Sequence, residues 1–304
     1  MQDPTDDERR ADRTRSDEPR ADGTPEFDRG RYLYCLVDAP GDNNEDAATA
    51  DFEAEGLAEE RAYLVRSGGV GAVVHGCESM YDSDDPRQVQ RWLLAHQRVV
   101  DEAGEAFGTP IPFRFHTILP GDDDTVREWL DGIRTEARAH LDELTGRWEY
   151  RISLHLDEEQ LEDRLAAEDE ELRSLRARTE SASEGKSFLL EKQYDQRVSK
   201  RVSERRQELL EELRQHIAPH VECAEVLGRR RATIEGVDAG AEPAQRVATL
   251  AHEDEVDALG AALDEVAANP GVEIEFTGPW PPYTFAPEFA GESLDEEIGS
   301  DGGR

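Results

Sequence analysis

A chain that performs chemistry brings nucleophiles, ligands or phosphate-binding glycines to defined spacings, and one stretch of this sequence comes close. The tetrapeptide Glu184, Gly185, Lys186, Ser187 ends like the loop that cradles nucleotide phosphates. That loop needs a glycine at position 180, where the chain has Glu180, and a strand directly before it, where the pattern is helical. We therefore predict no nucleotide site here.

A second group has the residue types of a metal site. His216 and His220 are four residues apart and Cys223 follows them, and imidazole and thiolate groups bind zinc. Pro219 breaks the helix on which this spacing would matter, so surface histidines are the better interpretation. The eight histidines form no pattern with Ser or Cys that indicates a nucleophile and its base, and carboxylates are too abundant for any pair to be informative. We predict no metal, no cofactor and no enzymatic activity.

The charge of the chain is unusual for a folded protein. The 304 residues include 71 acidic and 35 basic ones, a formal net charge of −36. Such a charge opposes a compact fold at low ionic strength, whereas at about 1 M salt the Debye length falls to about 3 Å and the repulsion is screened. We infer a halophilic protein of a salt-rich cytoplasm. A disordered acidic chain is the alternative, and the amphipathic segments described below argue against it.

The same sequence features exclude several classes of protein. Nucleic acid is not expected as a partner, because phosphate binding needs a basic face. No apolar stretch reaches the 18 residues of a membrane span, and no signal-peptide core follows Met1. Cys35, Cys77 and Cys223 are widely spaced and odd in number, which predicts reduced and mostly buried thiols.

Hydrophobic periodicity predicts an N-terminal α+β domain at residues 30–145, after a disordered acidic tail at 1–29. An acidic loop is expected between its first two strands, over 41–56. The expected strands and helices are strands at 31–37, 62–65, 70–75 and 113–119, and helices at 86–107 and 126–144. The apolar face of the first helix is expected to comprise Val89, Trp92, Leu93, His96, Val99 and Val100.

A second domain is predicted at residues 146–277. Residues 147–156, RWEYRISLHL, alternate strictly, so that Trp148 and Tyr150 begin a buried face and Glu149 and Arg151 an exposed one. The expected elements after this strand are two helices in an antiparallel hairpin over 157–217, broken at 181–187, then strands near 220–227 and at 246–252, a helix at 255–269 and a strand at 272–276. With the hairpin counted as one crossover, the order is β-α-β-β-α-β, which predicts a ferredoxin-like domain with a helical insertion.

The segment 278–290 concentrates proline and aromatic residues in a chain otherwise poor in both, before a tail at 291–304 that is expected to be disordered. Gly278 and Pro279 are expected to end the last strand, because proline removes a hydrogen-bond donor. Pro281 and Pro282 hold the backbone extended. The side chains presented in this way are those of Trp280, Tyr283 and Phe285. We expect the segment to pack across the two domains of its own fold, with docking onto a partner as the alternative.

Several of these motifs resemble those of one known family. TGPWPPYTF resembles the C-terminal signature of the gas vesicle protein F/L family, and the resemblance covers most of residues 31–290. RYLYCLV resembles the first strand of that family, and His96 in AHQRVV stands where the family has a histidine before a hydrophobic pair. PIPFRFHTIL resembles its Pro-x-Arg-Phe segment at Arg114 and Phe115, although His116 stands where a glycine is usual.

A further motif of the family falls in the long helices. GKSFLLEK resembles the pattern Gly-x-x-Tyr-Leu-x-x-Lys at Gly185, Phe188, Leu189 and Lys192, with Phe188 in place of the commoner tyrosine. The acidic composition and the long N-terminal tail favour the haloarchaeal L type over the shorter F type.

The resemblance implies a two-domain α+β protein with a ferredoxin-like C-terminal domain and no enzymatic activity. It implies an accessory protein of gas vesicle assembly that binds the hydrophobic shell subunit and other accessory proteins early in formation. Such a protein is expected in the cytoplasm or on gas vesicles, as a monomer or in a small hetero-complex. Because a fold does not fix a function, a small-molecule sensor or a halophilic enzyme on the ferredoxin-like domain is the alternative.

Overall fold

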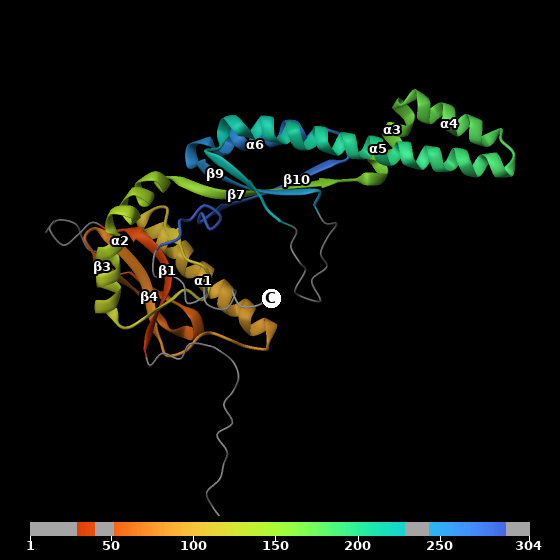
Figure 1. The fold of residues 1–304 in the computed structure, drawn as a ribbon. Coiled ribbons are helices and arrows are strands. Elements are labelled where there is room, and N and C mark those ends of the chain that lie inside the picture. Colours follow the sequence, from red (N-terminus) through yellow and green to blue (C-terminus); the bar gives the residue numbers. More distant parts are fainter. Residues whose placement is uncertain (1–28, 40–51, 229–242, 290–304) are drawn as a thin grey trace, which may run out of the picture.

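The computed structural model describes residues 29–39, 52–228 and 243–289, which form two antiparallel sheets with helices packed on them (Figure 1). The sequence prediction of a mixed α and β protein is confirmed. Apart from Arg29, the tails expected to be disordered, at 1–29 and 291–304, lie outside the described residues.

The first sheet lies between two helices. Its strands are β1 Gly30–Asp38, β2 Glu53–Glu55, β3 Arg61–Ser67, β4 Val70–Cys77, β5 Ile111–Pro112 and β6 Ile118–Pro120. They have the order β2-β3-β4-β1-β5, and β6 also pairs with β1. Helix α1 (Pro86–Phe107) packs on the face with Tyr32 and Cys35, and helix α2 (Asp123–Leu144) packs on the face with Leu33 and Leu36. Both faces of β1 are therefore buried, which explains its uninterrupted apolar sequence.

The second sheet has the order β10-β7-β9-β8, and all neighbouring strands are antiparallel. Its strands are β7 Arg147–Leu156, β8 Cys223–Val226, β9 Gln245–His252 and β10 Val272–Trp280. Helix α6 (Val256–Ala267) and the C-terminal part of helix α5 (Glu184–Ile217) cover one face. The alternation of β7 places Tyr150, Ile152 and Leu154 in that core, as the sequence predicts.

The helical hairpin projects beyond the second sheet (Figure 1). The prediction of two helices is wrong, because three form: α3 (Glu158–Glu168), α4 (Glu170–Glu180) and α5. Asp169 separates the first two, since its carboxylate accepts the Leu172 amide at 3.1 Å and caps α4. The same carboxylate pairs with Arg197 of α5 at 2.9 Å, which fixes the junction against the long helix.

The predicted strand at 113–119 is also wrong. Only Ile118–Pro120 pairs there, after a turn in which the Thr117 amide donates to the Arg114 carbonyl at 3.2 Å. His116 has a φ of +76°, a left-handed conformation that cannot continue a strand. A glycine at position 116, which the resemblance described above leads us to expect, would adopt this conformation without strain.

Three smaller predictions need correction. The expected acidic loop at 41–56 ends in a strand, β2, which pairs with β3. Leu93 was placed on the apolar face of α1, yet it is 46% exposed. Gly278 and Pro279 do not end the last strand: β10 skips them in its pairing with β7 and resumes at Trp280.

Candidate functional site

The proline-rich C-terminal segment, residues 278–289, lies on the second sheet at Glu149. The carboxylate of Glu149 accepts the backbone N–H of Thr284 at 2.7 Å and the Arg151 Nε at 2.9 Å. Glu149 is completely buried, although the alternation of β7 placed it on an exposed face. That prediction is wrong because the C-terminal segment covers this side of the strand.

On both sides of Thr284 the segment contacts residues that pack on the first sheet. Pro281 and Pro282 are buried, and the Tyr283 ring lies 6.3 Å from the His96 ring of α1. Phe289 packs against Phe113 at 6.5 Å, within the core beneath α2. The segment therefore contacts strand β7 of the second sheet and residues that pack on the first sheet. The other aromatic residues selected from the sequence, Trp280 and Phe285, are half-buried.

His96 belongs to a buried network of histidines and tyrosines between the first sheet and α1. Its Nε2 lies 3.1 Å from the Phe113 carbonyl and its Nδ1 lies 2.9 Å from the Tyr32 hydroxyl. Because a carbonyl only accepts, Nε2 carries the proton and Nδ1 accepts from Tyr32. Both ring nitrogens of His96 are thus satisfied, as expected of a core histidine.

A second histidine of this network was not selected from the sequence. His75 Nδ1 lies 2.9 Å from the Tyr34 hydroxyl, which accepts the Leu57 amide, and His75 Nε2 lies 2.7 Å from the Tyr81 hydroxyl. A histidine in a short apolar strand carries no signal that separates it from an ordinary core residue. Only the pairing of β1 with β4 brings His75 opposite Tyr32.

Burial keeps the two histidines neutral. It lowers the pKa of His75 and of His96 from 6.5 to about 4, and it raises the pKa values of Tyr32 and Tyr34. A neutral imidazole can act as a base. Here, however, each imidazole is already occupied by a tyrosine and a second group, and no serine or cysteine is among the hydrogen-bond partners. These hydrogen bonds link β4 and α1 to β1.

The Arg-Phe pair lies beside this network. The Phe115 ring is half-buried, 6.2 Å from the His96 ring. Arg114 is exposed and lies 3.4 Å from Glu288 of the C-terminal segment. The structure thus brings His96, Phe115 and Tyr283 close together, whereas the residues of the GKSFLLEK motif lie elsewhere.

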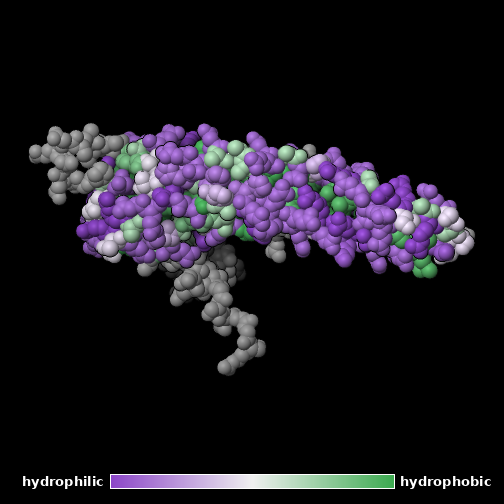
Figure 2. Space-filling model, turned by 90° about the horizontal axis from the view of Figure 1, so that it is seen from above, coloured by the Kyte–Doolittle hydropathy of each residue, from purple (hydrophilic) through white to green (hydrophobic). Residues whose placement is uncertain are grey.

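That motif occupies the free end of the hairpin. Phe188 and Leu189 are 59% and 61% exposed, and Lys192 lies over the Phe188 ring at 5.8 Å. A Cβ added at Gly185 would meet nothing within 4 Å, so packing does not require a glycine there. Figure 2 shows hydrophobic atoms at this end of an otherwise mostly hydrophilic face. We call Lys186, Phe188, Leu189 and Lys192 the hairpin tip. The Gly185-Lys186-Ser187 sequence thus begins a helix that follows α4, with no preceding strand.

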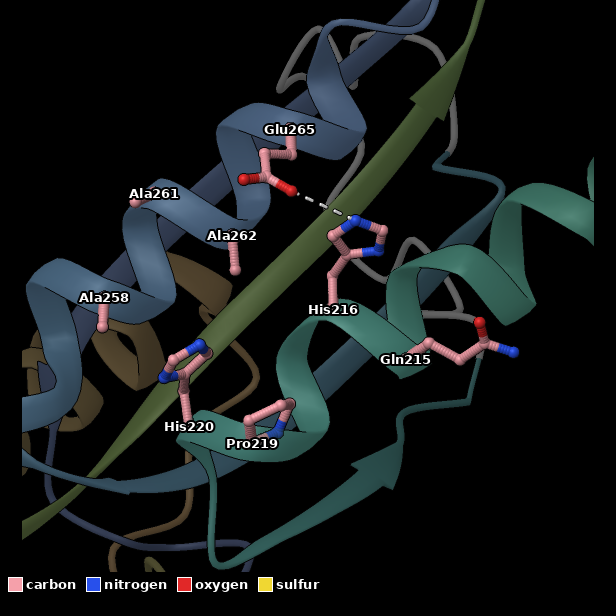
Figure 3. A pocket seen from close by; sticks show the side chains of 8 residues that line it. All are labelled: Gln215, His216, Pro219, His220, Ala258, Ala261, Ala262 and Glu265. Atoms are coloured by element: carbon pink, nitrogen blue, oxygen red, sulfur yellow. Dashed lines mark ion pairs between the residues drawn. The ribbon is translucent and has the colours of Figure 1, made fainter.

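The histidines considered as metal ligands line a shallow groove of about 450 Å³ between the end of α5 and α6 (Figure 3). His216 Nε2 lies 3.4 Å from Glu265, and His220 Nδ1 lies 3.0 Å from Glu255. Cys223 lies outside the groove, on β8. Across the described residues, no three His, Cys, Asp or Glu side chains gather as metal ligands would. The thiol prediction holds for Cys35 and Cys77, which are buried, but Cys223 is exposed.

Among the helices in the described part of the chain, none has the length and apolar character needed to cross a membrane.

Comparison with known proteins gives a consistent result. A family model described as "Gas vesicle synthesis protein GvpL/GvpF" matches residues 30–287. The chain is 43% identical over 260 residues to gas vesicle protein L1 of Halobacterium salinarum, covering 85% of this chain and 91% of the relative. It is 38% identical over 283 residues to gas vesicle protein L of Haloferax mediterranei, covering 85% and 88%.

Solved structures show the same relationship at the level of the fold. The crystal structure of the gas vesicle protein GvpF from an Anabaena species has a TM-score of 0.64 at 17% identity, and the match covers 86% of this chain and 99% of that one. GvpF from Microcystis aeruginosa gives a TM-score of 0.58 at 15% identity, covering 85% and 99%. At such identities the likeness shows the fold alone.

Proposed function

This chain belongs to the gas vesicle synthesis protein GvpL/GvpF family, and on that ground we propose that it is a non-enzymatic accessory protein of early gas vesicle assembly. Its haloarchaeal relatives are L proteins, so it is of the L type and has a role in gas vesicle formation. In the proposed role it binds the hydrophobic shell subunit and other accessory proteins. It acts in the cytoplasm, alone or in a small hetero-complex, and associates with forming vesicles.

The exposure of the hairpin tip is the observation that supports shell-subunit binding. Two adjacent large apolar side chains, Phe188 and Leu189, are about 60% exposed at the end of a hairpin whose flanks are charged. An apolar site with a polar rim is typical of a protein interaction surface. A shell subunit that aggregates in water needs such a contact, and the acidic body of the protein would keep the complex dissolved.

We assign the C-terminal segment a structural role within this function. Supporting this are the bond from Thr284 to the buried Glu149 and the packing of Phe289 beneath α2. On this proposal the chain has an N-terminal domain at 30–145 and a second domain at 146–277, and residues 278–290 clasp the two together. The second domain is classed as ferredoxin-like, because its β-α-β-β-α-β order and its sheet order of fourth, first, third and second strand fit that arrangement.

Co-purification from vesicle-forming cells tests the proposed function. The tagged full chain is expected to retain the shell subunit at molar salt. Leu189→Asp, which places a charge at the tip, is expected to abolish this retention while leaving the melting temperature unchanged. If the wild-type chain captures neither the shell subunit nor any other accessory protein, the proposal fails. If Leu189→Asp still captures the shell subunit, the assignment of the tip is wrong.

A further inference from the structure

The first two thirds of α1 carry basic side chains only, whereas the protein as a whole has a strongly negative net charge. From Pro86 to Val100 the chain has three arginines and neither Asp nor Glu, in a sequence with twice as many acidic as basic residues. Leu94 and Leu93 are exposed in the same stretch, by 63% and 46%. We call Arg87, Arg91, Leu93, Leu94 and Arg98 the α1 patch.

The arginines surround Leu94 on one side of the helix. Arg91 is three residues before it and Arg98 four residues after it, and these spacings make side chains neighbours on a helix surface. Arg87 lies one turn before Arg91, on the same side. The Arg91 and Arg98 side chains are themselves 61% and 50% exposed. An apolar side chain thus stands among exposed guanidinium groups.

The arginines of this stretch make exposed ion pairs on and beside their own helix. The N-terminus of a helix favours negative charge, and α2, α3 and α4 each have two acidic residues in the first turn. Helix α1 has none there and no basic residue in its last turn, while Arg87 and Arg91 lie near its N-terminus. Arg91 lies 4.0 Å from Asp85, and Arg98 lies 3.3 Å from Glu55 and 3.9 Å from Glu102. Arg98 also donates to the Glu55 carbonyl at 3.0 Å. Ion pairs between exposed side chains contribute little to stability. The N-cap Asp85 suits the helix dipole, but Arg87 in the first turn opposes it, and the three arginines run against the acidic composition of the chain. We look for the reason for this pattern in a contact outside the chain.

We propose that the α1 patch binds an acidic, amphipathic segment of another gas vesicle accessory protein, one that inserts an aliphatic side chain beside Leu94. This inference rests on the proposed function and adds a second surface to it. Guanidinium groups pair with carboxylates in bidentate geometry, with N···O distances of about 2.7 to 2.9 Å. The screening length at 1 M salt is about 3 Å, so salt weakens distant charge interactions more than such a direct contact. Arginine is also enriched among the side chains that dominate binding energy at interfaces.

The charge of the α1 patch distinguishes it from the hairpin tip. From Glu184 to Asp195 the sequence of the tip has two lysines and three acidic residues, whereas Pro86 to Val100 has three arginines and no acidic residue. The acidic residues beside the α1 patch, Asp85, Glu55 and Glu102, lie outside that stretch. A strongly hydrophobic partner suits the tip, whereas an acidic one suits the α1 patch. Three arginines on a protein of charge −36 do not make a nucleic-acid surface, because that needs an extended basic face.

Two variants of the full chain test this assignment, with a matched control at the tip. Leu94→Asp places a carboxylate among the carboxylates of the partner, and Arg91→Glu reverses a single charge without touching an apolar contact. Leu189→Asp is the control, because Leu189 and Leu94 are almost equally exposed, at 61% and 63%. The probes are the shell subunit and each other gas vesicle accessory protein of the same cell, tagged in turn and bound at fixed molar KCl.

Both α1 variants are expected to bind one acidic accessory protein at least about tenfold more weakly than the wild type, while capture of the shell subunit is unchanged. Leu189→Asp is expected to do the reverse. All three side chains are exposed, so the variants are expected to have the melting temperature of the wild type. If Leu94→Asp melts at a lower temperature, the binding of Arg91→Glu decides the test.

Several outcomes would overturn the proposal. The first is that both α1 variants bind every accessory protein as tightly as the wild type does, in an assay in which the wild type captures its partners. This result would refute the α1 patch and leave the proposed function standing. A lost partner whose binding segment is basic, or a loss confined to self-association of the chain, would also refute it. Failure of the wild-type chain to capture any probe would instead refute the proposed function, and the inference with it.

Discussion

Lowering the pH from 7 to 5 is expected to destabilise this protein through two buried histidines. His75 of β4 and His96 of α1 are buried between the first sheet and α1, and burial lowers the pKa of each from 6.5 to about 4. Above pH 6.5 the imidazoles are neutral in both the folded and the unfolded chain and have no effect on stability. Between pH 6.5 and 4 the unfolded chain takes up protons that the folded chain does not. The free energy of unfolding therefore decreases as the pH is lowered through this range.

The size of the effect follows from the two pKa values. At pH 5 a histidine whose pKa changes from 6.5 to about 4 on folding lowers the free energy of unfolding by about 2 kcal/mol. Both histidines lower the free energy of unfolding, and about 2 kcal/mol is already a considerable part of the roughly 5 to 15 kcal/mol that stabilises an ordinary domain. Below pH 4 both states are protonated and the loss levels off.

Urea unfolding at a fixed molar KCl concentration measures this effect, because urea is uncharged and leaves the screening unchanged. The 71 acidic residues also titrate, so the informative quantity is the difference between the wild type and His96→Gln. The variant keeps an amide that can bond to Tyr32 and the Phe113 carbonyl, but it cannot titrate. Its unfolding free energy should fall by about 2 kcal/mol less between pH 7 and 5. Equal slopes for the two proteins would refute the argument that His96 is buried in the neutral form.

Three further predictions concern the charge, the hairpin and the C-terminal segment. The chain should be compact above roughly 1 M KCl and lose tertiary structure as the Debye length grows to about 10 Å at 0.1 M, and near-UV circular dichroism unchanged at 0.1 M would contradict this. Leu172→Asp should cost about 3 to 5 kcal/mol, because it places an unpaired charge in the dry contact between α4 and α5; an unaltered melting temperature would show that this contact is misassigned. Glu149→Ala should cost roughly 2 to 4 kcal/mol, since it removes the acceptor of the Thr284 N–H and the partner of Arg151. Urea unfolding measures that loss, and a change within about 0.5 kcal/mol would mean that the segment does not depend on this carboxylate.

Local sequence patterns predicted the bounds of those elements that have one continuous apolar face. The alternation in 147–156 gave strand β7 to the residue, and the 3.6-residue period of 86–107 gave the bounds of α1. Both succeed because one face of each element is apolar along its whole length. Leu93 shows the limit of this reasoning, since the period places it on the buried face, yet its side chain is 46% exposed.

Contacts between residues far apart in the sequence determine the features that local patterns did not predict. Glu149 has the pattern of a solvent-facing residue, and it is buried only because Thr284, 135 positions away, lies on it. The apolar run 113–119 has the composition of a strand, but the left-handed His116 and the hydrogen bond of its amide to the Tyr32 hydroxyl turn the chain instead. The aromatic segment was recognisable, yet its buried members are Pro281, Pro282 and Phe289, whereas Trp280 is half-buried.

The hairpin separates the stability of the protein from its proposed contact with the shell subunit. Helix α5 has 34 residues, which at 1.5 Å per residue give a length of roughly 50 Å, and only its C-terminal part packs on the second sheet. Its N-terminal part is held by the buried leucines of α4 and by the pairing of Asp169 with Arg197. The same change, leucine to aspartate, should therefore have opposite effects at two points of one arm. At Leu172 it should lower the melting temperature, because that side chain is completely buried, and at Leu189 it should leave the melting temperature unchanged and remove the binding of the shell subunit.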